Sequence, residues 1–159
     1  MIGAGAHAPD FELPDQEGEP VRLSALRGRT VVLYFYPKAD TPGCTTQACS
    51  IRDRHDAYAA AGVKVIGVSP DPLGKVKRFH DKQDLNFTLL ADADHAVCDE
   101  YGVWVEKSMY GRKYWGAARA TFLIDADGVI RHVIPKASPK THDDEVLKAL
   151  EELELASLG

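Results

Sequence analysis

Two cysteines lie five positions apart in the stretch TPGCTTQACS, residues 41 to 50. A cysteine reacts as its thiolate, and a helix N-terminus stabilises such an anion because its first N–H groups lack intrahelical partners. Pro42 and Gly43 directly precede Cys44, where a helical pattern begins, so Cys44 is predicted to lie in a first helical turn. The Thr41 hydroxyl is then placed to hydrogen-bond a bound oxygen or the sulfur. The stretch is a candidate reactive-thiol site; a small buried residue in a strand-to-helix turn is the alternative.

The elements that would position these cysteines alternate between strands and helices. The run TVVLYFYP, residues 30–37, is continuously apolar, β-branched and aromatic, as expected of a strand buried on both faces. A helix is predicted over 44–61, closed by Gly62, and a second buried strand over 63–69. The other predicted elements are a hairpin of 11–13 with 20–23, a helix over 72–83, a strand over 87–92, a short helix over 94–101 capped by Asp94, a hairpin turning at Asp127-Gly128, and a helix over 143–155.

Strands that alternate with helices, followed by a hairpin and a final helix, predict an α/β fold. We expect a mixed central sheet flanked by helices, with a hairpin near the N-terminus. No internal repeat, low-complexity tract or linker interrupts the chain, so residues 1–159 are expected to form a single domain.

The composition is that of an ordinary globular protein and excludes several classes of function. The net charge is −5, from 24 acidic and 19 basic residues spread along the chain. This charge balance does not indicate the basic surface that binding to nucleic acid or to an anionic membrane would need. The longest apolar run, residues 31–36, is too short to span a bilayer, and the first residues do not resemble a secretory signal. The expected location is cytoplasmic, where the three cysteines would be reduced.

The segment YFYPKADTPGCTTQACSIRD resembles the active-site segment of the peroxiredoxins, Pro-x-x-x-Thr-x-x-Cys, at Pro37, Thr41 and Cys44. With the additional Cys49, the segment resembles the branch of that family called bacterioferritin comigratory protein or peroxiredoxin Q. Two further segments, GVSPD at 67–71 and RATFLID at 119–125, also resemble the family in the expected order. The resemblance covers nearly the whole chain and implies a thioredoxin-like fold.

The resemblance also implies a role for each matched residue. Cys44 matches the peroxidatic cysteine, which attacks hydrogen peroxide or an organic hydroperoxide and becomes a sulfenic acid. Thr41 matches the hydroxyl that positions the peroxide, and Pro37 the ring that shields the site. Arg119 matches the arginine that stabilises the thiolate and the developing charge. Cys49 matches the resolving cysteine, which forms an intramolecular disulfide that thioredoxin, or a similar dithiol protein, would reduce. The family resemblance implies a monomer, and we expect neither a cofactor nor a metal.

Two other functions remain as alternatives at this point. A thioredoxin-type disulfide oxidoreductase typically carries Cys-x-x-Cys, whereas Cys44 and Cys49 are separated by four residues. A thiolate metal-binding module would need paired Cys or His motifs, and the three cysteines are dispersed. Cys98 is predicted to be a buried structural thiol, and becomes the candidate resolving cysteine only if Cys49 does not fill that role.

Two further features of the sequence lead to expectations about the surroundings of Cys44. His55 follows Cys44 by eleven residues, about 16 Å along a helix, which is too far for it to act as a base; a more distant histidine could still fold into the site. The segment YGRKYWG, residues 110–116, is basic and aromatic, and is predicted to be a loop that borders the active site.

Overall fold

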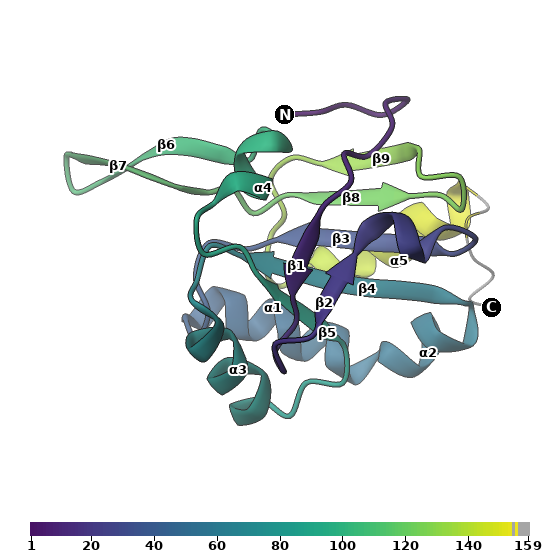
Figure 1. Cartoon of the computed structure of the whole chain (residues 1–159), viewed down its shortest axis with the longest axis horizontal. Coiled ribbons are helices and arrows are strands. Elements are labelled where there is room, and N and C mark those ends of the chain that lie inside the picture. Colours follow the sequence, from purple (N-terminus) through teal and green to yellow (C-terminus); the bar gives the residue numbers. More distant parts are fainter. Residues whose placement is uncertain (154, 156–159) are drawn as a thin grey trace.

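The structure, a computed structural model, describes residues 1–153 and 155 and has a five-stranded sheet at its centre (Figure 1). The first three strands of the sheet along the chain run parallel, and the last two run antiparallel to their neighbours. This arrangement confirms the predicted mixed sheet. In spatial order the strands are β5 (Thr88–Ala91), β4 (Val63–Ser69), β3 (Thr30–Phe35), β8 (Thr121–Ile124) and β9 (Ile130–Ile134).

The central strand β3 is apolar on both faces because both faces of the sheet are covered. Val32 and Tyr34 point into one hydrophobic cluster, and Val31 and Leu33 point into another on the opposite face. Helices cover the face that carries Tyr34, and we call it the helix face. These helices are α1 (Pro42–Asp53), α2 (His55–Ala60), α3 (Leu73–Lys82) and α5 (His142–Glu152).

The opposite face of the sheet is covered by the N-terminal hairpin and one short helix (Figure 1). The predicted hairpin is confirmed as β1 (Glu12–Pro14) paired with β2 (Pro20–Arg22) and followed by the 3-10 helix η1 (Leu23–Leu26). The short helix is α4 (Ala96–Glu100). Its N-cap residue is His95 and not, as predicted, Asp94, although the Asp94 carboxylate accepts a hydrogen bond from the Ala96 amide. Cys98 lies in this helix and is fully buried.

The prediction of a single helix over 44–61 is wrong. The structure has two helices, α1 and α2, which meet at Arg54. No glycine or proline marks this break in the sequence. Arg54 instead pairs with two carboxylates at the start of α5, those of Asp143 (3.3 Å) and Asp144 (2.8 Å). Gly62, at φ 76°, follows α2 in the left-handed conformation expected of a helix stop.

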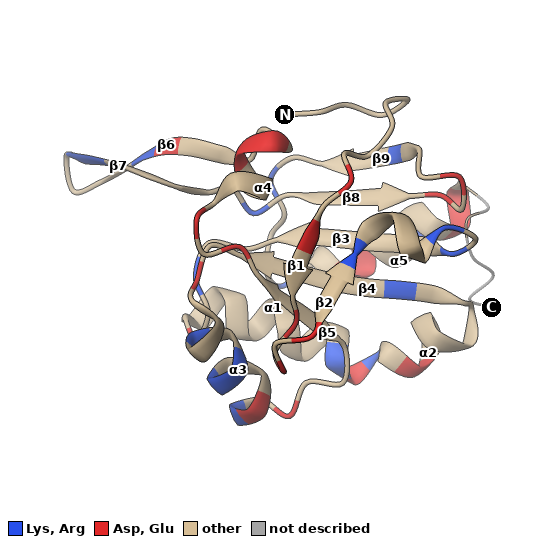
Figure 2. Ribbon diagram, in the orientation of Figure 1, with Lys and Arg blue, Asp and Glu red and all other residues tan. Residues whose placement is uncertain are grey.

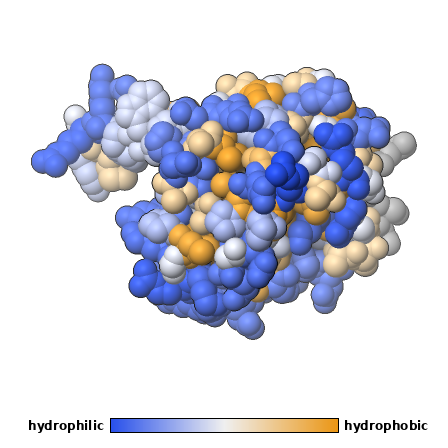
Figure 3. Space-filling view, viewed as in Figure 1, coloured by the Kyte–Doolittle hydropathy of each residue, from blue (hydrophilic) through white to orange (hydrophobic). Residues whose placement is uncertain are grey.

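The prediction of a loop over 110–116 is also wrong, because most of this segment is a strand. It belongs to a hairpin of β6 (Trp104–Met109) and β7 (Arg112–Ala117) that projects from the body (Figures 1 and 3). Tyr110 (φ 51°) and Gly111 (φ 76°) form its turn, and positive φ at both central residues matches the twist of a two-residue hairpin.

The remaining C-terminal elements agree with expectation apart from one boundary. The hairpin that turns at Asp127-Gly128 is confirmed, with Gly128 at φ 85°. The last helix was predicted to reach residue 155, but α5 ends at Glu152, and Glu154 lies outside the described residues. Within residues 1–153 and 155, no helix is long and apolar enough to cross a membrane.

Candidate active site

Cys44 lies in the first turn of α1, just beyond the carboxyl end of the central strand β3. Pro42 begins the helix, where its missing N–H costs nothing, and Thr41 is the N-cap residue. The Cys44 side chain is 1% exposed, and the thiol is free. The predicted placement of this cysteine at a helix start is therefore confirmed.

The loop that leads into α1 is held by hydrogen bonds at both ends. The Ala39 amide donates to the carboxylate of Asp71 at 2.7 Å, and Asp71 is buried just after β4. The Thr41 hydroxyl donates to the Lys38 carbonyl at 2.8 Å instead of capping the helix. Two consequences follow: the hydroxyl keeps its lone pairs as acceptors, and, among the described side chains, none caps the first-turn amides of α1.

Arg119 reaches the first turn of α1 from the connection between β7 and β8. Its Nη1 donates to the Gln47 Oε1 at 2.7 Å. Its Nη2 lies so close to Gly43 that a Cβ on that glycine would sit 3.2 Å away. The guanidinium therefore lies against the residue next to Cys44, and the structure brings together two residues that are 75 positions apart in sequence (119 − 44).

Three buried side chains that sequence reasoning missed continue this contact into the core. The Gln47 Nε2 lies 3.0 Å from His142 Nδ1, and His142 Nε2 lies 2.6 Å from the Thr121 Oγ1. Burial, and secondarily the charge of Arg119, lower the pKa of His142 to about 4. Gln47 could have been found as the residue one helical turn after Cys44. His142 is a distant histidine of the kind that the sequence left open, but nothing in the sequence singled it out among the six histidines.

A second cation, Lys107, lies midway along β6 in the projecting hairpin, opposite Tyr114, and its side chain reaches back toward the same site. Its ammonium donates to the Ala117 carbonyl. Burial lowers the pKa of Lys107, the charge of Arg119 lowers it further, and Cys44 opposes the shift. The hairpin therefore approaches the site through the Lys107 side chain and the strand ends near Ala117, whereas Tyr110 at its tip is 97% exposed.

Cys49 lies one and a half turns after Cys44 in the same helix and is half-buried. Its thiol donates to the Gln83 Oε1 at 3.5 Å, and Arg52 donates to the Gln83 carbonyl at 2.7 Å. In a regular helix, Cα atoms five residues apart are separated by about 8.7 Å. A disulfide needs less than about 7 Å, so this conformation holds the two thiols apart.

The third cysteine, Cys98, is on the opposite face of the sheet from Cys44. Burial, and then the nearby Asp92 carboxylate, raise the pKa of the Cys98 thiol well above its usual range. Its environment is that of an inert structural thiol, as predicted. Among the described residues, no three His, Cys, Asp or Glu side chains cluster closely enough to hold a metal ion. His55 lies in α2, where its ring is 6.2 Å from that of Phe87.

An open groove of about 650 Å³ adjoins Thr41 and runs between the 38–41 loop and α3. Its cationic side chains, Lys38, Lys75, Arg78 and Lys82, include the basic residues that mark α3 in Figure 2. Pro37 is half-buried at the start of the same loop. Thr41, the N-cap residue of α1, lines this groove, whereas Cys44 and Arg119 do not.

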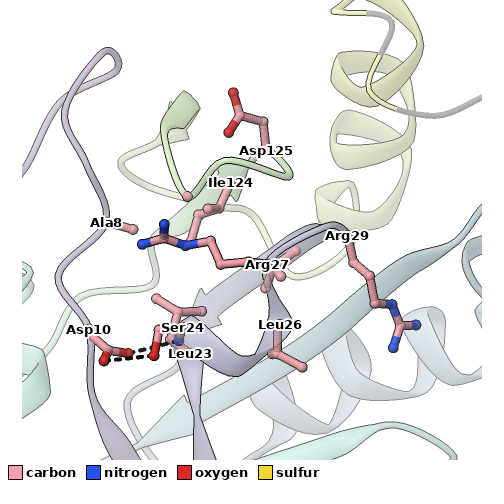
Figure 4. Close-up of a pocket in the computed structure, with 11 residues that line it drawn as sticks. Ala8, Asp10, Leu23, Ser24, Leu26, Arg27, Arg29, Ile124 and Asp125 are labelled. Carbon is pink, nitrogen blue, oxygen red and sulfur yellow. Dashed lines mark hydrogen bonds between the residues drawn. The ribbon is translucent and has the colours of Figure 1, made fainter.

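The pocket drawn in Figure 4 is elsewhere in the molecule. It lies at the amino end of β3, where the Arg27 side chain passes between Ala8 and Ile124. The Ser24 hydroxyl donates a hydrogen bond to the Asp10 carboxylate in this pocket. None of the residues that line it is a cysteine or a predicted site residue.

Comparison with known proteins relates nearly the whole chain to peroxiredoxins. Residues 4–133 match the AhpC/TSA family. The chain is 54% identical over 151 residues to peroxiredoxin Bcp of Escherichia coli (strain K12), covering 95% of this chain and 97% of that protein. Among solved structures, peroxiredoxin Q of Xanthomonas campestris is 35% identical with a TM-score of 0.88, covering 96% of this chain and 99% of that one. The bacterioferritin comigratory protein of the same organism is 36% identical with a TM-score of 0.85, covering 90% and 91%.

These similarities confirm the predicted thioredoxin-like fold as well as the family. The segments that suggested the resemblance, at 34–53, 67–71 and 119–125, all lie within the matched range and meet around α1 in the structure. The chain therefore belongs to the AhpC/TSA family, among its Bcp peroxiredoxins.

Proposed function

We propose that the protein is a thiol-dependent peroxidase in which Cys44 reduces hydrogen peroxide and organic hydroperoxides. The observation that carries this proposal is the buried Cys44 in the first turn of α1, with the Arg119 guanidinium against Gly43. The similar Xanthomonas campestris protein is described by its alkyl peroxide reduction activity. A helix N-terminus and a nearby cation are the surroundings in which a thiolate is stabilised.

In the first step, the Cys44 thiolate attacks the outer oxygen of the hydroperoxide. An S–O bond forms and the O–O bond breaks, so that the sulfur loses two electrons and becomes a sulfenic acid. The departing oxygen leaves as an alkoxide or hydroxide and takes up a proton. Negative charge moves from sulfur to oxygen in this step, and the Arg119 guanidinium with the uncapped first-turn amides of α1 can stabilise it on both atoms.

Thr41 and Pro37 complete the proposed site. The Thr41 hydroxyl already donates to the Lys38 carbonyl, so it is free to accept a hydrogen bond from the O–H of a hydroperoxide. This contact would orient the outer oxygen toward Cys44. Pro37 presents an apolar ring at the start of the same loop, which limits access of water to the sulfur.

In the second step, the Cys49 thiol attacks the Cys44 sulfenic acid, giving an intramolecular disulfide and one molecule of water. The two residues are too far apart for this bond while α1 is a regular helix. We therefore propose that the first turns of α1 unwind, which releases Cys49 from Gln83 and exposes the disulfide. The distance between the two thiols in the reduced helix would let peroxide oxidise Cys44 before Cys49 can reach the Cys44 sulfur.

In the third step, a dithiol protein such as thioredoxin reduces the disulfide and restores both thiols. This reductant, a monomeric state, a cytoplasmic location and a single domain over residues 1–159 stay predictions, each open to direct measurement. This function needs a peroxide as substrate and a dithiol protein as reductant, and it needs no cofactor.

The experiment that tests this function treats reduced protein with one equivalent of peroxide and follows the cysteines by mass spectrometry. Wild type should show a Cys44–Cys49 disulfide, and Cys49→Ser should stop at a Cys44 sulfenic acid that dimedone traps. Cys44→Ser should lose peroxide reduction, and Cys98→Ser serves as the matched control that keeps it. If Cys44→Ser retained the wild-type rate, the assignment of Cys44 would be wrong.

A further inference from the structure

The Arg119 guanidinium is held by a chain of buried hydrogen bonds that crosses the helix face. The chain runs from Arg119 to Gln47 of α1, then to His142 of α5, and ends at Thr121 of β8. Gln47 and His142 are each 1% exposed, and Thr121 is fully buried. Water is therefore excluded from the links between Gln47, His142 and Thr121, where each donor and acceptor depends on the next, whereas the Arg119 end of the chain is part-buried.

The direction of every hydrogen bond in this chain follows from Arg119. A guanidinium has only donors, so Gln47 must turn its Oε1 toward Arg119. Its amide nitrogen, which can only donate, then faces His142. The His142 Nδ1 must therefore accept, and its proton lies on Nε2, which donates to the Thr121 hydroxyl.

His142 can accept only while it is neutral. Burial, followed by the charge of Arg119, lowers its pKa to about 4, so the neutral ring predominates at physiological pH. Two other groups face or flank it. The Tyr34 ring of β3 lies 5.6 Å away between centroids, and the Asp143 carboxylate is turned to Tyr58 and Arg54. The Asp143 carboxylate is thus occupied elsewhere, and the Tyr34 hydroxyl, which has no hydrogen-bond partner among the described residues, makes no bond to Gln47 in this arrangement.

We propose that His142 is a positioning residue for peroxide reduction: by accepting from Gln47, it fixes the amide that holds the Arg119 guanidinium beside Cys44. Without this acceptor, the Gln47 amide would bury an unpaired N–H group and would gain by turning away from Arg119. The guanidinium would then lose its fixed direction, although its charge would remain. This inference rests on the proposed role of Cys44 as the thiol that peroxide oxidises.

Two substitutions of the same chemical type separate this role from general packing. In His142→Asn, the short side chain places an amide oxygen near the position of Nδ1, where it can accept from Gln47. In His142→Gln, the longer side chain places its amide near the position of Nε2, beside Thr121. Both variants keep a polar, uncharged group at a buried site, and each is made in wild type and in an Arg119→Met background.

The measured quantity is the second-order rate constant for oxidation of Cys44 by hydrogen peroxide at pH 7, followed by stopped-flow fluorescence. In wild type, His142→Gln should slow this step about tenfold, the equivalent of one buried hydrogen bond, and His142→Asn should restore most of the rate. In the Arg119→Met background, His142→Gln should slow the oxidation further by less than about twofold. The reason is that the effects of two substitutions are not additive when one residue acts through the other.

Tyr58→Phe is the control for damage to α5, since it removes the neighbouring hydrogen bond to Asp143 without touching Gln47. It should lower thermal stability and leave the rate constant unchanged. An equal rate loss from His142→Gln in both backgrounds, or equal rates for the Asn and Gln variants, would overturn the role of His142 alone. A wild-type protein whose Cys44 does not react with peroxide would overturn the proposed function, and this inference with it.

Discussion

At the scale of single residues, the proposed site contains a charged side chain that hydrogen bonding holds in one direction. Arg119 is half-buried and uses one nitrogen for Gln47 while the other lies over Gly43. A guanidinium is planar and can make both contacts at once, whereas a lysine ammonium is a single point of charge. The geometry of Arg119, and not only its charge, should therefore contribute to the rate.

We expect Arg119→Met to slow the oxidation of Cys44 by about 100-fold, the usual cost of losing one preorganised electrostatic contact in a transition state. The oxidation rate of Arg119→Lys should lie between those of wild type and Arg119→Met, because lysine keeps the charge and loses the bridging geometry. Stopped-flow oxidation at pH 7 measures both variants, with Arg112→Met of the exposed strand β7 as the matched control. A lysine variant as slow as the methionine variant would mean that charge alone contributes nothing.

Protonation of His142 should also make the stability of the fold depend on pH. The pKa of His142 is lowered from 6.5 to about 4 by burial and then by Arg119. As the pH falls below 6.5, the unfolded chain takes up this proton and the folded chain does not, so stability is lost between pH 6.5 and 4. The expected loss is about 2 kcal/mol between pH 8 and pH 5.

Urea unfolding of wild type and His142→Asn at both pH values isolates this contribution. Other groups also titrate, among them Asp143, whose pKa is raised by burial, but both proteins share them. The difference in the free energy of unfolding between the two proteins should therefore change by about 2 kcal/mol. A difference that does not change with pH would mean that His142 is protonated equally in both states.

The sequence pointed to the residues proposed to react and missed those that contact Arg119 in the structure. Cys44, Thr41 and Cys49 lie within one short segment, whose order and helix-start signals are visible in the chain itself. Arg119 was found only through family resemblance, since nothing local distinguishes it from the other arginines. Gln47 and His142 meet through tertiary packing of α1 on α5, and no property of either residue's neighbours in sequence reports that contact.

At the scale of secondary structure, the proposed cycle requires α1 to hold the reduced thiols apart and then to unwind before the disulfide forms. Thr46 lies on the exposed side of this helix between the two cysteines, and its hydroxyl bonds back to the Pro42 carbonyl. Its side chain takes part in none of the site contacts described above. Substitutions at Thr46 can therefore change the stability of α1 without changing the surroundings of Cys44.

We expect Thr46→Gly to form the Cys44–Cys49 disulfide about fivefold faster than Thr46→Ala. The reason is that glycine costs about 1 kcal/mol more than alanine in a helix, and unwinding precedes bond formation. Quenched-flow alkylation with mass spectrometry measures disulfide formation, and stopped flow measures the preceding oxidation of Cys44, which should be equal in the two variants. Equal rates of disulfide formation would show that unwinding of α1 does not limit this step.

The predicted secondary structure was correct for the strands and hairpins whose sequence signals are strongest. The buried strands, the N-terminal hairpin and the hairpin at Asp127-Gly128 all have such signals. The break at Arg54 has none, because it accompanies ion pairs with α5 that form only in the folded chain. The β6–β7 hairpin was missed because its exposed strands carry polar, aromatic and basic residues, and its composition indicated a surface loop.

At the scale of the whole molecule, the helix face connects α1 to two other helices, while the opposite face does not. Cys49 and Arg52 both bond Gln83 at the end of α3, and Gln47 bonds His142 at the start of α5. The opposite face packs β1, β2 and α4 in a separate hydrophobic cluster beyond the sheet. Unwinding of α1 should therefore loosen the ends of α3 and α5 and leave the opposite face unchanged.

Hydrogen exchange measured in the reduced and the disulfide forms tests this distribution. In the disulfide form, amides over 46–52 should lose protection, as should those of His142 and Glu145, which bond the carbonyls of Ser138 and Thr141. Amides of β3 and α4 should exchange at the same rate in both forms. Cys49→Ser treated with one equivalent of peroxide is the control, because it carries the Cys44 sulfenic acid without the disulfide and should keep α1 protected. Loss of protection in that variant would assign the change to oxidation of Cys44 itself, and equal protection in both forms of wild type would contradict unwinding altogether.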